Sequence, residues 1–378
     1  MSTKKKHILF QAAPFCFGPI ATTLNVVREL AGSGHHLTLI GEGPTHDLLD
    51  REDFEFDKLP ASTVKPFSEE LEQLIREADL VVSNTDPPFA AACIRRGAKV
   101  VVIDTLFWMW DHIDPILLQS DSYIIQNFIG VEQQMARIGR PQNLLVVGPL
   151  TQKQEQPIPQ GERDNFLLVS LGGCDCNLVA KESDPYPEII CRLIECVLEQ
   201  ESLDIEVMLA TGERSANALC AKTASVQIGT FSNKEHVDLI RRAKGVMLSP
   251  GLTGSMEVFE GGTPVFFLPP QNYSQVLQMK AFRRSEVAGH SFSWFDVYPE
   301  LAPPPYLPEE EAVAIVRDAI GKCIQDEKTW TTFYQTVKAF LETGIQNFDP
   351  TPGYRLRTRL GIDGVRKASE RILQILEE

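Results

Sequence analysis

Ser249-Pro250-Gly251-Leu252-Thr253-Gly254-Ser255 joins an apolar run, Gly245–Ser249, to a segment with helical character, Met256–Gly261. Glycines let the backbone approach a ligand closely, and the amino-terminal end of a helix presents unpaired N–H groups to an anion. The stretch therefore predicts a strand, a turn that holds a diphosphate, and a helix. Glu257 falls in the first turns of that helix, where its carboxylate can accept hydrogen bonds from a ribose diol.

Each of these features also has a purely structural explanation. Glycine-rich turns are common in α/β folds, and the helix dipole alone favours a Glu near a helix start. The combination favours a ligand site, because other predicted strand ends carry glycine-rich or polar sequences as well. These are Gly172-Gly173, Thr211-Gly212 and Gln271-Asn272-Tyr273-Ser274-Gln275.

Short runs rich in Val, Ile and Leu, without alternation, recur along the whole chain and predict strands covered on both faces. In the first part they are His7–Ala13, His36–Gly41, Asp79–Asn84, Lys99–Asp104, Tyr123–Asn127 and Asn143–Gly148. In the second part they are Asn165–Leu171, Ile205–Ala210, Val226–Phe231, Gly245–Ser249 and Pro264–Leu268. Helical patterns lie between them, such as Ala21–Gly32, Glu188–Glu199 and Lys234–Ala243. The fold class expected is α/β, with two tandem Rossmann-like domains, each with a parallel sheet, and a cleft between them.

Residues 151–164 are rich in Gln, Pro, Gly and charged residues and predict an exposed linker. We therefore expect an N-terminal domain over residues 1–150, the linker, a second domain over residues 165–345 and a tail over residues 346–378. The tail contains a predicted helix, Gly364–Leu376.

The composition excludes several classes of protein. The 378 residues include 36 Lys+Arg and 51 Asp+Glu, so a net charge of −15 argues against nucleic-acid binding. No apolar run of about 18 residues and no signal peptide is present, which predicts a cytoplasmic protein without an integral membrane segment. Eight scattered cysteines favour reduced thiols. Cys174-Asp175-Cys176 has no second Cys/His pair at zinc-site spacing, so no metal is predicted.

Residues 226–289 contain, in order, a predicted strand, Phe231, a helix, the 249–255 turn, Glu257, Gly262-Thr263-Pro264, a strand and residues 271–275. This order resembles the nucleotide-sugar half of GT-B glycosyltransferases. The nearest patterns are those of the lipid-intermediate N-acetylglucosaminyltransferase of peptidoglycan synthesis and of UDP-sugar transferases that act on small molecules. Residues 18–41 resemble the first βαβ unit of the same enzymes, so the likeness extends over the organisation of nearly the whole chain.

The resemblance implies a transferase that uses a UDP-sugar as donor substrate and needs no other cofactor. It implies that Phe231 lies along the uracil and that Glu257 holds the ribose. It also implies that the last helix packs on the first domain. The donor-binding residues expected on this basis are Gly172, Gly173, Thr211, Gly212, Phe231, Pro250, Gly251, Leu252, Thr253, Gly254, Ser255, Glu257, Gln271, Asn272 and Gln275.

One departure from the family concerns the base. Many of these enzymes use a His in the first strand–helix loop, but our alignment places Pro19 there, in Phe15-Cys16-Phe17-Gly18-Pro19-Ile20. Either another side chain is the base, or the acceptor attacks through a nitrogen that needs none, or the protein is not a transferase. The catalytic residues expected under the first alternative are Asp86, Asp104 and His112, with Asp111 beside the last. Each aspartate could equally be a helix cap or turn residue.

The acceptor-binding residues expected are Phe17, Gly18, Pro19, Trp108 and Trp110. The two indoles either stack on a planar acceptor or pack beneath a loop. The start of the first loop is also similar to cytosylglucuronate synthases, which would make the acceptor a pyrimidine base and the donor a uronic acid. A uronic acid calls for a cation, and the candidates are Arg214, Lys234, Lys280 and Arg283.

The resemblance thus implies an inverting transferase. We expect it to be metal-independent, because no Asp-x-Asp motif follows an appropriate strand and a helix amino terminus can stabilise the departing UDP. Two alternatives stay open: a nucleotide-sugar 2-epimerase of the same architecture, and a non-catalytic UDP-sugar-binding protein. The partners expected are a small-molecule donor and acceptor, with a homo-oligomer as a further alternative.

Overall fold

The structure is a computed structural model that describes residues 5–53, 56–63, 66–154, 156–172, 174, 184–201, 203–220, 225–304 and 307–378. It divides into two compact units. Unit 1 consists of Met1–Gln152 together with Leu360–Glu378, and unit 2 of Lys153–Arg359. Each unit is built on one parallel sheet, which confirms the predicted α/β class with two Rossmann-like parts.

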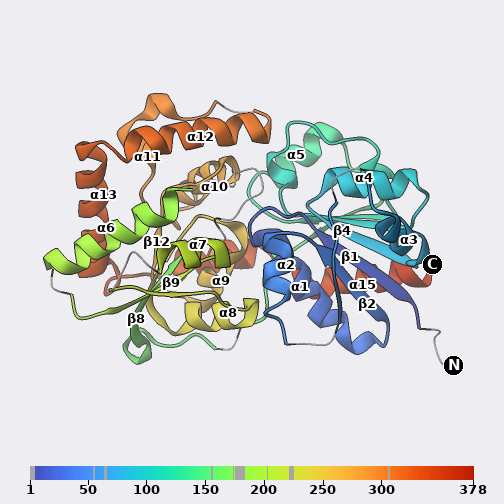
Figure 1. The fold of residues 1–378 in the computed structure, drawn as a ribbon, viewed down its shortest axis with the longest axis horizontal. Coiled ribbons are helices and arrows are strands. Elements are labelled where there is room, and N and C mark those ends of the chain that lie inside the picture. Colours follow the sequence, from blue (N-terminus) through green and yellow to red (C-terminus); the bar gives the residue numbers. More distant parts are fainter. Residues whose placement is uncertain are drawn as a thin grey trace. The chain divides into compact units, whose positions relative to one another are not determined.

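Unit 1 contains a seven-stranded sheet in the order β3-β2-β1-β4-β5-β6-β7. Its strands β1, β2 and β4 are labelled in Figure 1. Its strands are β1 (His7–Ala12), β2 (His36–Gly41), β3 (Asp57–Pro60), β4 (Leu80–Asn84), β5 (Val100–Asp104), β6 (Ser122–Gln126) and β7 (Leu144–Val147). Its helices are α1 (Gly18–Leu30), α2 (Pro44–Leu49), α3 (Glu69–Glu77), α4 (Pro87–Arg95), α5 (Val131–Ile138) and α15 (Gly364–Glu377). The neighbours β1 and β4 mark the point where the strand order reverses, because the strands numbered from β1 and those numbered from β4 extend toward opposite edges of the sheet.

The predicted strands of unit 1 are confirmed to within about one residue at each end, and only β3 was missed. The central strands β4 and β5 are buried at every position, because the sheet is covered on both faces. In contrast, β3 has the sequence DKLP and lies at the edge of the sheet, where its side chains are exposed or half-buried. It lacks the apolar run on which the prediction relied.

The end of the chain completes the core of unit 1. Helix α15 packs against α1, and Ile372 and Leu376 share a buried cluster with Leu24 and Val27. The approach to α15 needs glycine: a Cβ placed on Gly364 would lie 2.0 Å from the carbonyl oxygen of Gly148. The backbone after β7 and the first turn of α15 are therefore in direct contact.

Unit 2 contains a five-stranded sheet in the order β10-β9-β8-β11-β12. Its strands are β8 (Asp164–Ser170), β9 (Glu206–Ala210), β10 (Gln227–Gly229), β11 (Ala243–Leu248) and β12 (Val265–Phe267). Its helices are α6 (Tyr186–Glu201), α7 (Glu213–Leu219), α8 (Asn233–Arg242), α9 (Leu252–Gly261), α10 (Tyr273–Arg284), α11 (Trp294–Val297), α12 (Glu309–Cys323) and α13 (Glu327–Ala339), while α14 (Thr351–Leu360) ends at the border of the unit. Here the order reverses direction between β8 and β11.

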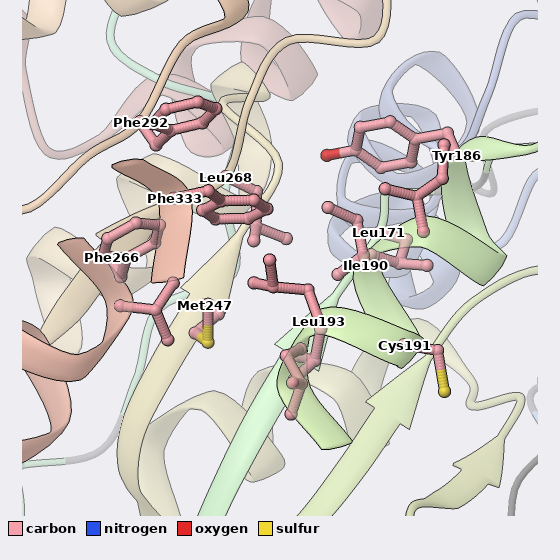
Figure 2. Packing of buried hydrophobic residues seen from close by; sticks show 14 of the residues in the cluster. Leu171, Tyr186, Ile190, Cys191, Leu193, Met247, Phe266, Leu268, Phe292 and Phe333 are labelled. Carbon is pink, nitrogen blue, oxygen red and sulfur yellow. The ribbon is translucent and has the colours of Figure 1, made fainter. Parts of the chain in front are cut away.

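Aromatic packing fixes one side of this second sheet (Figure 2). The rings of Phe292 and Phe333 are stacked at 4.7 Å between centroids, and Phe333 also lies against Phe266 of β12. On the other side of the view, Tyr186 of α6 donates a hydrogen bond of 2.7 Å from its hydroxyl to the carbonyl oxygen of Pro269. The chain that leaves β12 is thus held by buried side chains on its way to α10.

Candidate functional site

The loops that follow β8, β11 and β12 meet at the carboxyl edge of the unit 2 sheet. The Gln271 side-chain nitrogen Nε2 donates to the Leu171 carbonyl oxygen at 2.8 Å and to the Ser249 hydroxyl oxygen at 2.6 Å. Gly172 adopts a φ of +65°, and a Cβ placed on it would lie 3.7 Å from the Cβ of Ser249. In open parallel sheets ligands bind at the point where the strand order reverses, which here is between β8 and β11. Gly173 lies outside the described residues.

Helix α9 begins at Leu252, four residues before the predicted start at Met256. The predicted turn residues Leu252, Thr253, Gly254 and Ser255 therefore form the first helical turn. A single glycine in a first turn does not prevent helix formation, and Gly254 fits because a Cβ there would lie 3.2 Å from Leu248. The N-cap is Gly251, which provides no side-chain cap, and no acidic residue lies in the first turn. Such a helix end favours an anion.

Glu257 lies in the second turn of α9 and is 1% exposed. Its backbone carbonyl accepts a hydrogen bond of 2.7 Å from Gln154 Nε2, so the helix is also held from the chain that precedes β8. A buried carboxylate is stabilised by hydrogen-bond donors, and the hydroxyls of a ribose are donors of that kind. Pro250 is buried just before the helix.

Asn272 and Gln275 shape the start of α10. The Asn272 side-chain oxygen caps the helix by accepting from the Gln275 backbone N–H at 3.0 Å. The Gln275 side-chain oxygen accepts from the Gln271 backbone N–H at 2.9 Å. Sequence reasoning did not identify Trp294, whose indole Nε1 donates to the carbonyl oxygen of Pro270 at 2.9 Å. The three predicted sugar-contacting residues are therefore fixed in position by one another and by the core.

The ends of β9 and β10 provide Thr211, Gly212 and Phe231. Thr211 is 4% exposed, and its hydroxyl has no hydrogen-bond partner among the described residues. Gly212 is the N-cap of α7. The half-buried ring of Phe231 covers Gly229 so closely that a Cβ on that glycine would lie 2.4 Å from the ring atom Cζ. A larger residue at Gly229 would displace the ring.

A histidine not predicted from the sequence lies beneath this edge. His236 Nε2 of α8 is 2.9 Å from the hydroxyl oxygen of Ser170, the last residue of β8. Burial lowers the pKa of His236 to about 4, so its imidazole is neutral at pH 7. The weak sequence signal was a His on the helix Asn233–Arg242, next to the apolar position Val237.

In unit 1 the order of strands reverses between β1 and β4, and both loops after these strands contain a non-glycine residue with positive φ. Cys16 has a φ of 54° and Thr85 a φ of 55°. For a β-branched residue such as Thr85 this conformation is a marked outlier, and such strain is most often kept at functional sites. Phe17 is the N-cap of α1, Gly18 its first residue, and Pro19 is buried with its carbonyl accepting from Asn84 Nδ2 at 2.8 Å.

Asp86 follows Thr85 and caps α4 by accepting from the Phe89 N–H at 3.0 Å. Its other carboxylate oxygen accepts from Gln11 Nε2 at 2.7 Å and from the Thr63 hydroxyl at 3.3 Å. The Gln11 side-chain oxygen Oε1 in turn accepts from the Ser83 hydroxyl at 2.9 Å. Burial raises the pKa of Asp86, and these donors offset part of that effect. Gln11 was not predicted, although a Gln inside a buried strand was a visible signal.

Asp104 is buried at the end of β5 and accepts hydrogen bonds from three neighbours. The donors are the Tyr123 hydroxyl at 2.7 Å, the Leu106 N–H at 2.8 Å and the Trp110 indole Nε1 at 3.1 Å. Burial raises the pKa of the carboxyl. Asp104 thus ties the loop that carries Trp110 to the sheet.

The other candidate residues of the loop after β5, Trp108 and His112, differ in how deeply they are buried. Trp108 is half-buried, with its ring centroid 4.8 Å from that of Phe128. His112 is exposed, and the neighbouring Asp111 forms an ion pair of 3.1 Å with Arg137.

The four cations considered for a uronic acid are also distributed over different elements of unit 2. Arg214 and Lys234 are exposed in the first turns of α7 and α8, and Lys280 is exposed on α10. Arg283 forms an ion pair of 2.6 Å with Asp296. None of them joins the hydrogen-bonded group around Gln271 within the described residues.

Solved structures of the same fold exist, although no protein-family model and no curated protein sequence matches the chain. A glycotransferase of kitacinnamycin is 12% identical, with 99% of this chain and 100% of that chain covered and a TM-score of 0.54. TcCGT1 in complex with UDP is 12% identical, with 98% and 100% covered and a TM-score of 0.54. A UDP-glucosyltransferase from Polygonum tinctorium is 12% identical, with 100% of both chains covered and a TM-score of 0.51.

The chain has the GT-B fold. At 12% identity the likeness shows the fold and not the activity. Within the described part of this GT-B chain, no helix combines the length and apolar character needed to cross a membrane. Among the same residues no group of at least three His, Cys, Asp or Glu side chains is arranged to hold a metal ion.

Proposed function

We propose that the protein transfers a sugar from a UDP-sugar to a small-molecule acceptor, with inversion and without a metal ion. The observation that carries the proposal is the hydrogen-bonded meeting of the β8, β11 and β12 ends around Gln271, next to the uncapped first turn of α9. That place was predicted from the sequence as the donor site. The GT-B fold, which the UDP-bound TcCGT1 also has, supports the same interpretation.

Unit 2 would bind the donor. The diphosphate would accept hydrogen bonds from the N–H groups of Leu252, Thr253 and Gly254, and the helix dipole would stabilise the negative charge that develops on UDP as it leaves. Glu257 would accept from the ribose hydroxyls and Phe231 would lie along the uracil. No cation is needed for this stabilisation, because the N–H groups are fixed in advance.

Unit 1 would receive the acceptor, with Asp86 as its base. Attack of an acceptor oxygen or nitrogen on the anomeric carbon forms the new bond, the bond to the phosphate oxygen breaks, and the acceptor proton moves to the Asp86 carboxylate. The Gln11 amide orients that carboxylate, and the raised pKa makes it a better proton acceptor than an exposed aspartate. Asp104 receives three protein donors and acts as a positioning residue for the Trp110 loop.

The acceptor is proposed only as a small molecule with a transferable O–H or N–H proton. A nitrogen nucleophile such as a pyrimidine base, the more specific sequence-based hypothesis, would depend less on Asp86. Replacement of Asp86 by Asn therefore separates the two kinds of acceptor.

Calorimetric titration with UDP and a panel of UDP-sugars in EDTA tests the donor site, and product analysis tests the reaction. We expect UDP to bind, UDP release to require an acceptor, and the product to have the opposite anomeric configuration by NMR coupling constants. Conversion of a UDP-sugar incubated alone would instead indicate an epimerase. Binding without turnover across the acceptor panel would indicate a binding protein, and no binding of any nucleoside diphosphate would refute the proposal.

A further inference from the structure

A cavity separate from the residues around Gln271 lies in unit 2, along the later part of α10. It has a volume of about 250 Å³, is partly open to solvent, and lies between α10, α11 and the 3₁₀ turn Pro299–Leu301 that follows. Its lining is mixed: the polar or charged residues are Lys280, Arg283, Ser293 and Asp296, and the apolar ones are Val276, Met279, Phe295, Pro299 and Ala302. A cavity of about 150 Å³ can hold benzene. The present one therefore has room for an aromatic ring with a short side chain.

The charges around this cavity are unbalanced. Arg283 contributes to the lining, but its guanidinium is neutralised by Asp296, with N–O distances of 2.6 and 2.7 Å. Lys280, one helical turn before Arg283 on the same face, also lines the cavity. Its exposed ammonium forms no ion pair with any residue that the structure describes. Among the described residues, the Lys280 ammonium thus lies beside the apolar part of the pocket without an ion-pair partner.

We propose that this pocket binds a small apolar carboxylic acid, with the ring against Met279 and Phe295 and the carboxylate at Lys280. An apolar body with a single negative charge matches both the walls and the unmatched ammonium. A neutral molecule of the same shape would use only the walls. A cationic one would meet Lys280 with like charge.

The pocket shares structural elements with the residues around Gln271. Val276 lines it and directly follows Gln275, whose side-chain oxygen accepts from the Gln271 N–H. On α11, Trp294 lies between the lining residues Ser293 and Phe295 and donates to the Pro270 carbonyl. An acid that displaces α11 would change this hydrogen bond. We therefore expect the acid to alter the affinity for UDP, an effect that rests on the proposed function, and UDP must alter the affinity for the acid by the same factor.

The binding itself is tested without UDP, on the purified full-length protein, with 3-phenylpropionate and its neutral analogue 3-phenyl-1-propanol. Calorimetry or ligand-observed NMR should show saturable binding, stronger for the acid. Lys280→Gln should weaken binding of the acid by about fivefold, the usual scale for one partly exposed ion pair, and leave binding of the alcohol unchanged. The half-buried Ala302→Phe should fill the pocket and abolish binding of both probes.

Arg284→Gln is the matched control, because Arg284 is an exposed cation on the same helix that does not line the pocket. It should bind both probes like the wild type. Equal binding of the acid by Lys280→Gln and wild type, unchanged binding by a folded Ala302→Phe, or no saturable binding of the acid would each overturn the proposal. A protein that binds the acid but not UDP would keep the pocket and refute the proposed function, so the two failures are distinguishable.

Discussion

The side-chain nitrogen of Gln271 lies 2.6 Å from the hydroxyl oxygen of Ser249 and 2.8 Å from the carbonyl oxygen of Leu171. One amide group therefore connects the chain after β12 with the ends of β11 and β8. A donor sugar that takes over part of this hydrogen bonding would find its loops already in place, which lowers the entropy lost on binding.

Replacing Gln271 by Ala should raise the KM for the UDP-sugar by about tenfold, because a hydrogen bond of this kind contributes about 1–1.5 kcal/mol. The Kd for UDP alone should change less, since the amide is expected at the sugar and not at the nucleotide. Kinetics and calorimetry on the same preparations provide both numbers.

Gln160→Ala is the control for this variant. The Gln160 side chain also donates to a backbone carbonyl oxygen, that of Lys244 at 2.9 Å, but Lys244 lies at the start of β11 and not at its carboxyl end. The control should leave both constants unchanged. Equal losses of UDP and UDP-sugar binding in Gln271→Ala would contradict the assignment of this amide to the sugar.

Gly229→Ala should weaken UDP binding without contacting UDP. The added Cβ would occupy the place of the Phe231 ring, at 2.4 Å from Cζ, and push the ring away from its position. The loss should be similar to that of Phe231→Ala, and the double variant should lose little more than either single one, because both act through the same ring. Calorimetric titrations of the three variants test this. Additive losses would mean that the ring does not mediate the effect.

Asp86→Asn should lower kcat toward an oxygen acceptor by about 10²–10⁴-fold, the usual contribution of a general base. The amide oxygen can still accept from the Phe89 N–H, so α4 should keep its cap. Because Asp86 acts when ionised, the kcat of the wild type should fall as the pH drops through its pKa, which burial raises above the ordinary value.

Asp104→Asn is the comparison for Asp86. It should lower the melting temperature and leave this acidic limb of the pH profile in place. If the kcat of Asp86→Asn still fell at low pH as in the wild type, a residue other than Asp86 would be the base.

His236 should make the protein less stable in acid. Its pKa is lowered from 6.5 to about 4 by burial, so the neutral form is favoured in the folded state. Above pH 6.5 the His236 imidazole is neutral in both the folded and the unfolded protein, so the free energy of unfolding is not reduced. As the pH falls from 6.5 toward 4, only the unfolded state gains the proton, and folding loses up to about 3 kcal/mol.

Urea unfolding of wild type and His236→Gln at about pH 7 and about pH 4.5 checks this. The variant should lose less stability between the two pH values, since glutamine does not titrate. An identical loss in both proteins would assign the acid sensitivity to other groups.

The sheets could be predicted because their strands are continuous apolar runs: β2 has the bounds read from the sequence, while the exposed edge strand β3 has no such run. The connection from strand to helix at Gly251–Gly254 could also be predicted, although the start of the helix was placed too late. Gln11 and His236 could not be assigned, because their partners Asp86 and Ser170 are 75 and 66 residues away in sequence. The pocket beside Lys280 could not be predicted either, because its lining residues come from two separate segments, 276–283 and 293–302.

The helix α15 has a consequence for how the chain matures. Its apolar face covers α1 and the Gly148 backbone of unit 1, yet it follows the whole of unit 2 in the sequence. Residues 1–152 are synthesised long before their final helix exists, so Leu24 and Val27 remain exposed while unit 2 emerges. Domains usually fold in order of synthesis. Here unit 1 cannot complete its core until α15 has been synthesised, after the residues of unit 2.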